Sequence, residues 1–501
     1  MKVNKLVLAV VLCIQAASQT LLADATTEQI EALKQQIEQL TTKVLALEQQ
    51  ATAAKAQATP PASADSRLDQ LDQQVRVLEC KRELDQETAT EKAKQTPRVS
   101  FGANGFAVSS ADSNYTFRVR GYVQADARFY PSDRVDTTAT DTFLIRRARP
   151  IFEGTAAGKL DYRVMLDFGA QSSLSSANNA LLQDAYATLR LWPGLQIQGG
   201  KFKEPVGLER LQSGANLLFI ERAYPTQLVP NRDVGFQLQG DLFADTLRYE
   251  IGAFNGVADG GSGDFETADN DKDVAGRLFA QPFKNAHLDA LRGLGFGVAG
   301  TTGNQEGALR PFVSSGLQRF FTYRTSTATT QPNVLAAGGH WRVVPQAYYY
   351  WGPFGLLAEY AVSSSEVRQS GGGTGAGQQQ RLTHTAWQVA ASYFVTGEQN
   401  SFRAVAPKRA ATFSEGSGWG ALELAARVGQ LNVDKDAFPV YSDPAKSASG
   451  AFSYALGANW HLNRNLKLSL NWEHTTFDAP SGNPYHDNHE DVILTRAQFS
   501  F

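Results

Sequence analysis

From about residue 115 to the end of the chain, apolar and polar side chains alternate with a period of two. In residues 115–129, Phe117 and Val119 fall on one face of an extended chain, whereas Arg118 and Arg120 fall on the other. Strict alternation indicates a β-strand that has one face against an apolar medium. A soluble sandwich shows this pattern in a strand or two, but here it recurs to the last residue.

The number of such segments predicts a very large antiparallel sheet. We count sixteen strands, and residues 319–325 are a candidate for a further one, which leaves eighteen as the alternative number. Single-chain bacterial barrels have even numbers of strands. After the first strand, the clearest alternation occurs in residues 160–168, 185–191, 236–242, 247–253, 274–280, 341–349, 354–362, 387–395, 422–428, 452–460, 466–472 and 492–501.

The connections between these segments are alternately short and long. Tight turns fall at residues 192–195, 243–247, 351–354 and 462–466. This arrangement is typical of transmembrane β-barrels, in which short turns face the periplasm and long loops face outward. One connection, residues 397–418, stands where a short turn is expected and is long. The long loops occupy residues 131–141, 170–180, 204–233, 257–272, 303–338, 364–383, 433–449 and 478–490.

Composition agrees with a barrel and excludes membrane-spanning helices. Hydrophobic residues make up 42% of the chain and the mean hydropathy is -0.30. No apolar run reaches the length of about 18 residues that a spanning helix needs. A barrel strand is apolar on one face only, so its mean hydropathy is mild. Because lipid offers no hydrogen bonds to the backbone, a β protein can cross it only as a closed barrel.

The last strand ends on an aromatic residue, Phe501, and one of its faces is mostly apolar. This end of the chain resembles the export and assembly signal of bacterial outer-membrane barrels. The resemblance implies outer-membrane lipid and the barrel-assembly machinery as partners, and a pore wall whose function is transport.

The N-terminal part of the chain follows other patterns. Residues 1–25 have the features of a secretory signal peptide, since Lys2 and Lys5 precede an apolar stretch and Ala23-Asp24-Ala25 matches a cleavage site. Cleavage there would leave Cys80 as the sole cysteine, so an internal disulfide is excluded.

Residues 26–95 carry two heptad seams that are separated by an Ala- and Pro-rich linker at 51–66. We predict periplasmic coiled-coil segments that self-associate, because short isolated helices are marginal in water. A single amphipathic helix on another surface is the alternative, and peptidoglycan or another periplasmic partner is a candidate for contact. The seams run through Ile30, Leu33, Ile37, Leu40, Val44 and Leu47, and then through Leu68, Leu71, Val75 and Leu78.

The predicted fold class is therefore all-β: a 16-stranded antiparallel transmembrane β-barrel in residues 98–501, preceded by an N-terminal helical coiled-coil region. If the apolar faces of the strands meet lipid, the opposite faces line the lumen. The anion pathway is then expected to contain the arginines of those faces, namely Arg118, Arg120, Arg128, Arg147, Arg149, Arg163, Arg190, Arg248, Arg277 and Arg427.

Arginine is suited to an anion pathway because its planar guanidinium is always charged and binds phosphate through two hydrogen bonds. Rings or ladders of basic side chains set selectivity in anion pores. The same faces also carry Asp and Glu residues, and ion pairs would neutralise much of this field. On pattern alone, an anion-selective pore and a general pore with a structural charge network are equally open.

Several segments, in this order, resemble the phosphate-selective porin O/P family. Each segment is weak evidence alone, but together with the last strands they cover residues 118–501. The segments are Thr142-Phe-Leu-Ile-Arg-Arg-Ala-Arg-Pro-Ile-Phe-Glu-Gly154, Gly199-Gly-Lys-Phe-Lys-Glu-Pro-Val-Gly207, Phe219-Ile-Glu-Arg222, Arg232-Asp-Val-Gly235, Gly252-Ala-Phe-Asn-Gly256 and Trp419-Gly-Ala-Leu-Glu-Leu-Ala-Ala-Arg427.

The resemblance implies a homotrimeric outer-membrane pore for phosphate or polyphosphate, with an arginine ladder and an inward-folded third loop. That loop corresponds to residues 204–233. Its acidic residues Glu204, Glu209 and Glu221 depart from the lysine-rich loops of tight phosphate binders, which argues against high-affinity capture. The basic residues expected around the constriction are Lys201, Lys203, Arg210, Arg222 and Arg232.

Other classes of function receive little support. A formal net charge of -3 argues against a nucleic-acid partner. His486 and His489, with Glu490, have a spacing that could hold a metal ion, but solvated residues of a surface loop are the preferred interpretation. No nucleophile accompanies them, so we expect neither an enzyme nor a metal site, and no cofactor. A cell-envelope anchor, in which the pore is incidental, is the remaining alternative.

Overall fold

The computed structural model describes residues 42, 64–102, 105–131, 140–169, 181–265, 270–373, 375–412, 414, 416 and 418–501. The chain divides into two compact units, Met1–Glu91 and Lys92–Phe501. The predicted signal peptide and all residues of the first heptad seam lie outside the described residues.

Helix α2, Ala64–Gln95, contains the second heptad seam. Leu71, Val75 and Leu78 are 58%, 48% and 66% exposed, so no described residue packs over this seam. The structure therefore shows a helix at this position, and the coiled coil stays a prediction. Among the helices that the structure describes, none is long and apolar enough to cross a membrane.

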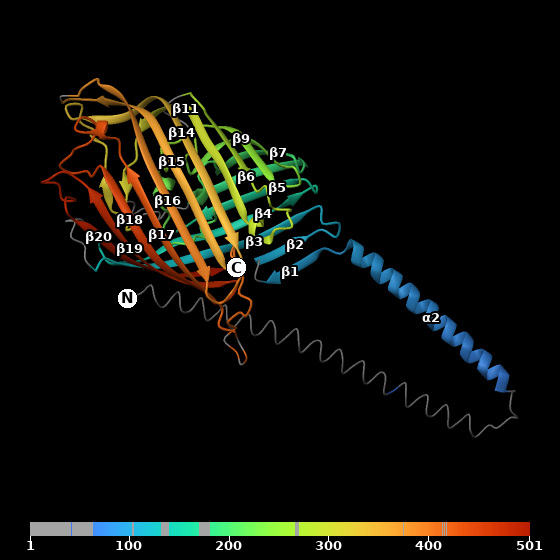
Figure 1. Ribbon diagram of the computed structural model, residues 1–501. Coiled ribbons are helices and arrows are strands. Elements are labelled where there is room, and N and C mark those ends of the chain that lie inside the picture. The colour runs from blue at the N-terminus through green and yellow to red at the C-terminus, as the bar shows by residue number, and fades with distance from the viewer. Residues whose placement is uncertain are drawn as a thin grey trace, which may run out of the picture. The chain divides into compact units, whose positions relative to one another are not determined.

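The second unit is a β-barrel in which sixteen strands of the described chain close into one antiparallel sheet (Figure 1). Closure joins the last strand to the first, because β20 pairs with β3 from Ser500↔Tyr122 to Ile493↔Phe129. The barrel strands are β3 (Thr116–Phe129), β4 (Thr142–Ala156), β5 (Leu160–Asp167), β6 (Leu181–Trp192), β7 (Leu195–Lys203), β8 (Arg232–Leu242), β9 (Leu247–Phe254), β10 (Asp273–Ala280), β11 (Leu294–Ala308), β14 (Asn333–Trp351), β15 (Phe354–Ser370), β16 (Gln379–Phe394), β17 (Ala421–Asn432), β18 (Gly450–His461), β19 (Leu466–Asp478) and β20 (His489–Ser500).

The side chains of each strand alternate between the outer face and the lumen. In β8, Phe236 is 72% exposed and Leu238 is 43% exposed, whereas Gln237 between them is buried. An exposed apolar band is typical of the outer surface of a transmembrane barrel, and buried polar side chains such as Gln237 and Gln239 hydrogen-bond to each other inside. The sixteen-stranded antiparallel barrel that was predicted from the period of two is confirmed.

Two further strands extend the same sheet without entering the barrel wall. β1 (Arg98–Gly102) pairs with β2 (Gly105–Ser109), and β2 pairs with residues 116–119 of β3. Those residues of β3 lie beyond the point where β20 ends, so the hairpin continues the sheet past the barrel seam. Counting this hairpin gives an eighteen-stranded sheet, but the barrel itself has sixteen strands.

The candidate strand at 319–325 lies inside a loop. β13 (Arg319–Phe321) pairs only with β12 (Phe312–Val313), so both belong to the loop of residues 309–332, which we call L5. Its apolar residues pack against other loops and against strand residues such as Phe477 and His384, and Phe320 and Phe321 are fully buried. Barrel strands also run further than the alternation indicated, since β15 reaches Ser370 within the loop predicted at 364–383. The hydrogen-bond ladder continues there above the apolar band.

The short ends of the barrel include two long connections. Residues 395–420 are long, as the sequence indicated, and residues 281–293 are a second exception that includes the short helix α4 (Asp289–Arg292). Polar turns between strands that are already paired are free to lengthen, so the simple alternation of short and long connections holds only in part.

Candidate conduction pathway

Residues 204–231 connect β7 to β8 and fold against the inner wall of the barrel; we call them loop L3. They contain one turn of helix, α3 (Leu208–Leu211), and a 3-10 turn, η1 (Tyr224–Gln227). Irregular backbone at membrane depth is tolerated only where protein or water satisfies its polar groups. The inward side chains of the wall provide this satisfaction.

The middle of L3 is held by side chains from five consecutive strands, of which β19 provides two. These side chains donate to carbonyl oxygens of L3, except Asn471, whose Oδ1 accepts from the Ile220 N–H. From β3 through β17 the bonds are Gln124 Nε2 to Gly214 O at 2.9 Å, Gln498 Nε2 to Ala215 O at 3.1 Å, Ile220 N to Asn471 Oδ1 at 2.7 Å, Lys467 Nζ to Leu217 O at 3.0 Å, Asn459 Nδ2 to Leu218 O at 2.8 Å and Arg427 Nη1 to Glu221 O at 2.9 Å.

The first part of L3 is anchored on the neighbouring strands. Glu359 of β15 accepts the N–H of Leu208 at 2.8 Å and that of Glu209 at 3.4 Å, which are free donors at the start of α3. Gln388 of β16 donates to both Glu209 at 3.0 Å and Glu359 at 2.7 Å, so it separates the two carboxylates. L3 is thus bound along the wall from β15 round to β3.

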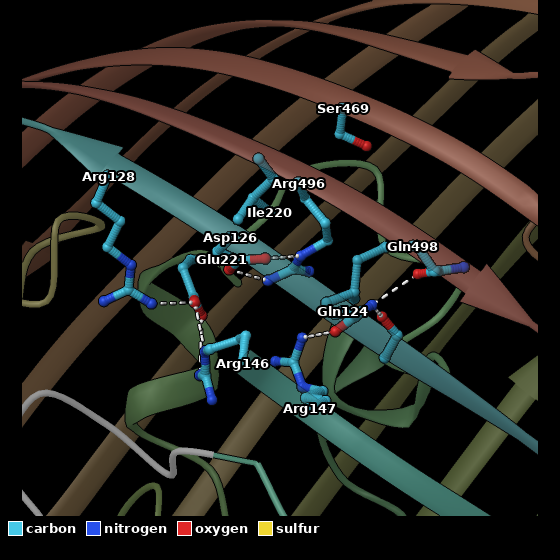
Figure 2. Close-up of polar contacts among 12 residues, drawn as sticks. Gln124, Asp126, Arg128, Arg146, Arg147, Ile220, Glu221, Ser469, Arg496 and Gln498 are labelled. Atoms are coloured by element: carbon cyan, nitrogen blue, oxygen red, sulfur yellow. Dashed lines mark hydrogen bonds and ion pairs between the residues drawn. The ribbon is translucent and has the colours of Figure 1, made fainter. Parts of the chain in front are cut away.

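One carboxylate of L3 joins two arginines of the wall. Glu221 Oε1 lies 3.1 Å from Arg128 Nη2 and 2.7 Å from Arg146 Nε (Figure 2). These cations hold the pKa of Glu221 far below its ordinary value, although burial alone would raise it. Figure 2 also shows Arg147, whose Nη1 donates to Gln124 Oε1 at 2.7 Å rather than to a carboxylate.

Apolar contacts complete the attachment of L3. Phe219 packs on Ala390, Ala425 and Ala455, and the guanidinium of Arg427 lies 4.4 Å from the centre of its ring. Sequence reasoning predicted Arg427 as a lumenal residue but overlooked Phe219 and the three alanines, as it did Asn459, Asn471 and Gln498. The alanines could have been recognised from the sequence, because a small apolar side chain on the polar face of a strand indicates that protein, rather than water, fills the lumen at that level.

Two adjoining cavities lie beside L3. The first, which we call the inner passage, has a volume of about 260 Å³ and lies between L3 and the wall from β4 to β9. The second, the mouth cavity, has a volume of about 460 Å³ and lies at the end of the barrel where β18 turns into β19. They share Tyr122, Arg163 and Ser213 as lining residues, so they adjoin each other, and we call the two together the route.

Cations outnumber carboxylates along this route. The inner passage is lined by Arg149, Arg163, Lys203 and Arg232, against Asp184 and Glu250. The mouth cavity is lined by Arg118, Arg120, Arg163, Arg403, Arg464 and Lys467, against Glu153, Glu209 and Glu423.

Eight of the ten predicted lumenal arginines form ion pairs with carboxylates. This result favours the charge network that the sequence left open, because paired charges produce a weak field at a distance. The pairs are Arg120–Glu153 at 2.6 Å, Arg128–Glu221 at 3.1 Å, Arg149–Asp167 at 2.7 Å, Arg163–Asp184 at 3.2 Å, Arg190–Asp161 at 2.9 Å, Arg248–Asp241 at 3.1 Å, Arg277–Glu250 at 3.0 Å and Arg427–Glu473 at 2.8 Å.

Arg118 and Arg147 form no ion pair within the part of the chain that is described. Arg118 is exposed in the mouth cavity, opposite Glu153 in the strand register. Arg147 is buried among Arg146, Arg149 and Arg496 and bonds to the neutral Gln124. Only Arg118 is open to solvent, so of these two side chains only Arg118 can meet a solute.

The predicted constriction residues fall into two groups. Lys201 is bound to Asp264, and Arg232 to Asp184 at 2.7 Å, so both are neutralised. Arg210 donates to the carbonyl of Thr226, whereas Lys203 and Arg222 converge on one carbonyl oxygen, that of Gln212, at 2.6 and 2.9 Å. No ion pair of these last three residues occurs among the described residues.

Lys203 and Arg222 therefore place two basic side chains on one neutral oxygen at the end of α3, and both side chains are half-buried. Burial lowers the pKa of Arg222 to about 10, with Glu209 opposing this and Arg149 and Arg232 adding to it. At neutral pH the group still carries its charge. Because no carboxylate pairs with these two donors among the described residues, the arrangement can hold an anion.

Comparison with known proteins adds three findings. A family model described as "Phosphate-selective porin O and P" matches residues 117–501. Porin O of Pseudomonas aeruginosa is 24% identical over 425 residues, which covers 79% of this chain and 91% of that protein.

Among solved structures, the outer membrane channel DcaP of Acinetobacter baumannii aligns with a TM-score of 0.48 at 12% identity, covering 79% of this chain and 99% of that one. An anion-selective porin from Comamonas acidovorans aligns with a TM-score of 0.48 at 11% identity, covering 77% of this chain and 100% of that one.

Proposed function

The chain belongs to the phosphate-selective porin O and P family, and we propose that its barrel conducts anions, with phosphate or polyphosphate as the main solute. Family membership makes it a channel of the outer membrane and not an enzyme. The proposal concerns selectivity: passive diffusion of anions through an Arg- and Lys-lined lumen that L3 narrows.

The observation that carries this proposal is the set of cations without ion pairs along the route. Arg118, Arg403 and Arg464 line the mouth cavity, Lys203 lines the inner passage, and Arg222 shares a carbonyl acceptor with Lys203. The paired arginines hold the wall and L3 in place, while the cations outside these pairs attract solutes. Conduction requires several modest sites rather than one deep trap, and separated single cations supply this.

Phosphate is the favoured solute for chemical reasons. A guanidinium offers two parallel N–H donors to two oxygens of one phosphoryl group. A polyphosphate would pass its successive phosphoryl groups from one cation to the next. The carboxylates of Glu209 and Glu153 near the same route limit affinity, so we expect weak binding and rapid passage.

The assembly belongs to the proposal as well. We expect a homotrimer, in keeping with the resemblance that the sequence showed, with residues 26–95 as a periplasmic coiled coil that contacts peptidoglycan or another partner. The barrel-assembly machinery would insert the chain. Closure leaves a sixteen-stranded barrel without unpaired strand edges. Protection of edges is therefore not the reason for association.

A general pore with a structural charge network is the second candidate. The eight ion pairs of the predicted ladder favour it, because each pair removes a charge from the field that a passing ion meets. The third candidate is a cell-envelope anchor, in which conductance through the barrel is incidental.

Planar-bilayer recording of the purified full chain tests the proposal. In a KCl gradient the reversal potential should show anion preference, and phosphate added to chloride should reduce the current. Arg118→Gln should lower the anion-to-cation permeability ratio by up to about tenfold, since one charge about 6 Å from an ion in water contributes about 0.7 kcal/mol, with opposite signs for an anion and a cation. Arg292→Gln is the matched control, because Arg292 is half-exposed, pairs with Asp289 and lines neither cavity.

Cation preference would overturn anion selectivity. No preference between anions and cations would support the general pore, and anion preference with a current indifferent to phosphate would overturn phosphate as the main solute. Unchanged permeability in Arg118→Gln would remove the mouth cavity from the selectivity mechanism.

A further inference from the structure

Three titratable side chains gather on the outer face of the last hairpin, away from the lumen. His474 belongs to β19, and His489 and Asp491 belong to β20. His474 lies opposite Asp491 in the strand register. All three alternate with lumenal residues such as Glu473 and Glu490, so they point outward, at the end of the hairpin where residues 479–488 connect the two strands.

The distances within this cluster suit a metal ion. His474 Nδ1 lies 2.9 Å from Asp491 Oδ1, and His489 Nε2 lies 3.4 Å from Asp491 Oδ2. One ligand atom from each residue can be chosen so that all three lie within 4.8 Å of one another. A tetrahedral ion with bonds of about 2.05 Å holds its ligands about 3.3 Å apart, so a small ring rotation would complete the site.

The surroundings favour an ion over three solvated side chains. The side chains of His474, His489 and Asp491 are 18%, 26% and 14% exposed, which leaves room for one or two waters as further ligands. The imidazole rings lie 5.0 Å apart, and Tyr454 stacks beside His474 at 5.1 Å. The aromatic wall limits the rotation of the ring and thereby organises the ligands before the ion arrives.

We propose that His474, His489 and Asp491 form a binding site for a divalent transition-metal ion of the zinc class on the outer wall of the barrel. Two imidazoles and one carboxylate are ligands that such ions prefer, whereas Ca²⁺ and Mg²⁺ prefer an all-oxygen set. The ion crosslinks β19 to β20 at the base of their connecting loop. The proposed metal site does not depend on the anion selectivity proposed above.

The strand pattern links this site to the lumen. Glu490 lies between the two ligands of β20 and points inward, where it accepts from Ser314 Oγ at 2.9 Å and from the Gly316 N–H at 3.3 Å. Ser314 and Gly316 belong to L5, which folds inside the barrel. An ion that fixes residues 489 and 491 therefore steadies the backbone segment that holds L5.

The sequence had drawn attention to a different pair, His486 and His489. In the structure His486 contacts Ala479 O at 2.8 Å and the neighbouring Asp487 at 3.4 Å, and it takes no part in the cluster. The true neighbour of His489 comes from another strand, fifteen residues away in the chain.

Isothermal titration with ZnCl₂ tests the site in the full chain, purified in detergent without a histidine tag and stripped with a chelator. Cys80→Ser serves as the background, because a thiolate also binds zinc. We expect one ion per chain. His474→Ala and His489→Ala should each weaken binding by at least about tenfold, given that even partners outside the ligand set matter by 10–100-fold. His486→Ala is the matched control and should bind like the background protein.

Two measurements guard against misfolding and nonspecific uptake. Asp491→Asn keeps the side-chain volume and should also lose affinity, while retaining the conductance and heat-modifiable mobility of a folded barrel. Co²⁺ should produce visible absorption bands of a low-coordinate ion in the background protein and not in His474→Ala. Failure to bind zinc, or binding that survives both histidine variants, would overturn the proposal.

Discussion

At the scale of single residues, Glu204 is the most unusual group of the pathway. It is fully buried at the first position of L3, and neither carboxylate oxygen has a hydrogen-bond partner. Burial holds its pKa well above the ordinary 4.5, with Asp233 and Asp273 adding to this and Arg342 opposing it. A buried carboxylate without partners is tolerable only when it is protonated.

The substitution Glu204→Gln should therefore make the folded protein more stable in alkaline solution. The folded form of the wild type keeps its proton above pH 4.5 while the unfolded form loses it, so stability falls as pH rises toward the raised pKa. Glu204→Gln lacks this loss. If the difference is about 1 kcal/mol, its thermal midpoint at pH 8 should exceed that of the wild type by about 2–4 °C.

Circular dichroism melting at pH 4 and pH 8 measures this. At pH 4 the two proteins should have the same melting temperature, because Glu204 is then largely protonated in both the folded and the unfolded wild type. A variant that melts lower than the wild type at both pH values would mean that Glu204 is an ionised group with a function of its own.

At the scale of elements, L3 is a loop whose position is determined by the strands around it. Side chains from β3, β20, β19, β18 and β17 in turn bond to its backbone, and Glu359 binds the start of α3. Because these bonds satisfy buried backbone groups, breaking them leaves polar atoms without partners. L3 should therefore behave as part of the wall rather than as a mobile lid.

Glu221→Gln tests this attachment. Removing the charge leaves Arg128 and Arg146 buried without their shared carboxylate, and breaking a buried pair costs about 3–5 kcal/mol. We expect faster amide hydrogen exchange in residues 214–221, noisier single-channel currents and stronger anion preference, since the lumen gains a positive charge. Asp289→Asn, in an exposed pair with Arg292, is the control. Exchange rates equal to those of the wild type would show that the neutral hydrogen bonds suffice.

At the scale of the whole molecule, the barrel and the N-terminal region are separate compact units. The sixteen strands close by β20 pairing with β3, and this closure does not depend on α2. The pore should accordingly keep its conductance without residues 26–95. Leu71, Val75 and Leu78 on α2 are exposed, and the predicted coiled coil would use them for association.

Deletion of residues 26–95 separates the two roles. Conductance per barrel should be unchanged in planar bilayers, whereas the oligomer should dissociate at a lower temperature on native gels. A deletion variant that loses conductance would assign the N-terminal region to the pore. A variant with an equally stable oligomer would leave the coil without a part in assembly.

The amino-acid sequence by itself determined the barrel: its period of two, its strand number and its lipid-facing surface. These follow from each residue's place in its own strand, since alternate side chains must face opposite sides. The sequence also identified the arginines of the lumenal faces and the loop that lies among them. Its boundaries failed where pairing continued beyond the apolar band, as in β15, because backbone hydrogen bonds do not require alternation.

Only the tertiary structure decided which of these charges are free. Arg149 and Arg163 are neutralised by Asp167 and Asp184, while Lys203 and Arg222 meet at a neutral carbonyl, and nothing in the spacing of these residues distinguishes the two cases. The partner of a side chain is set by strand register and by the course of L3 across the lumen. The same reason separates His489 from His486 and brings it to His474: proximity within a closed sheet is a property of paired strands, whereas sequence spacing describes one strand at a time.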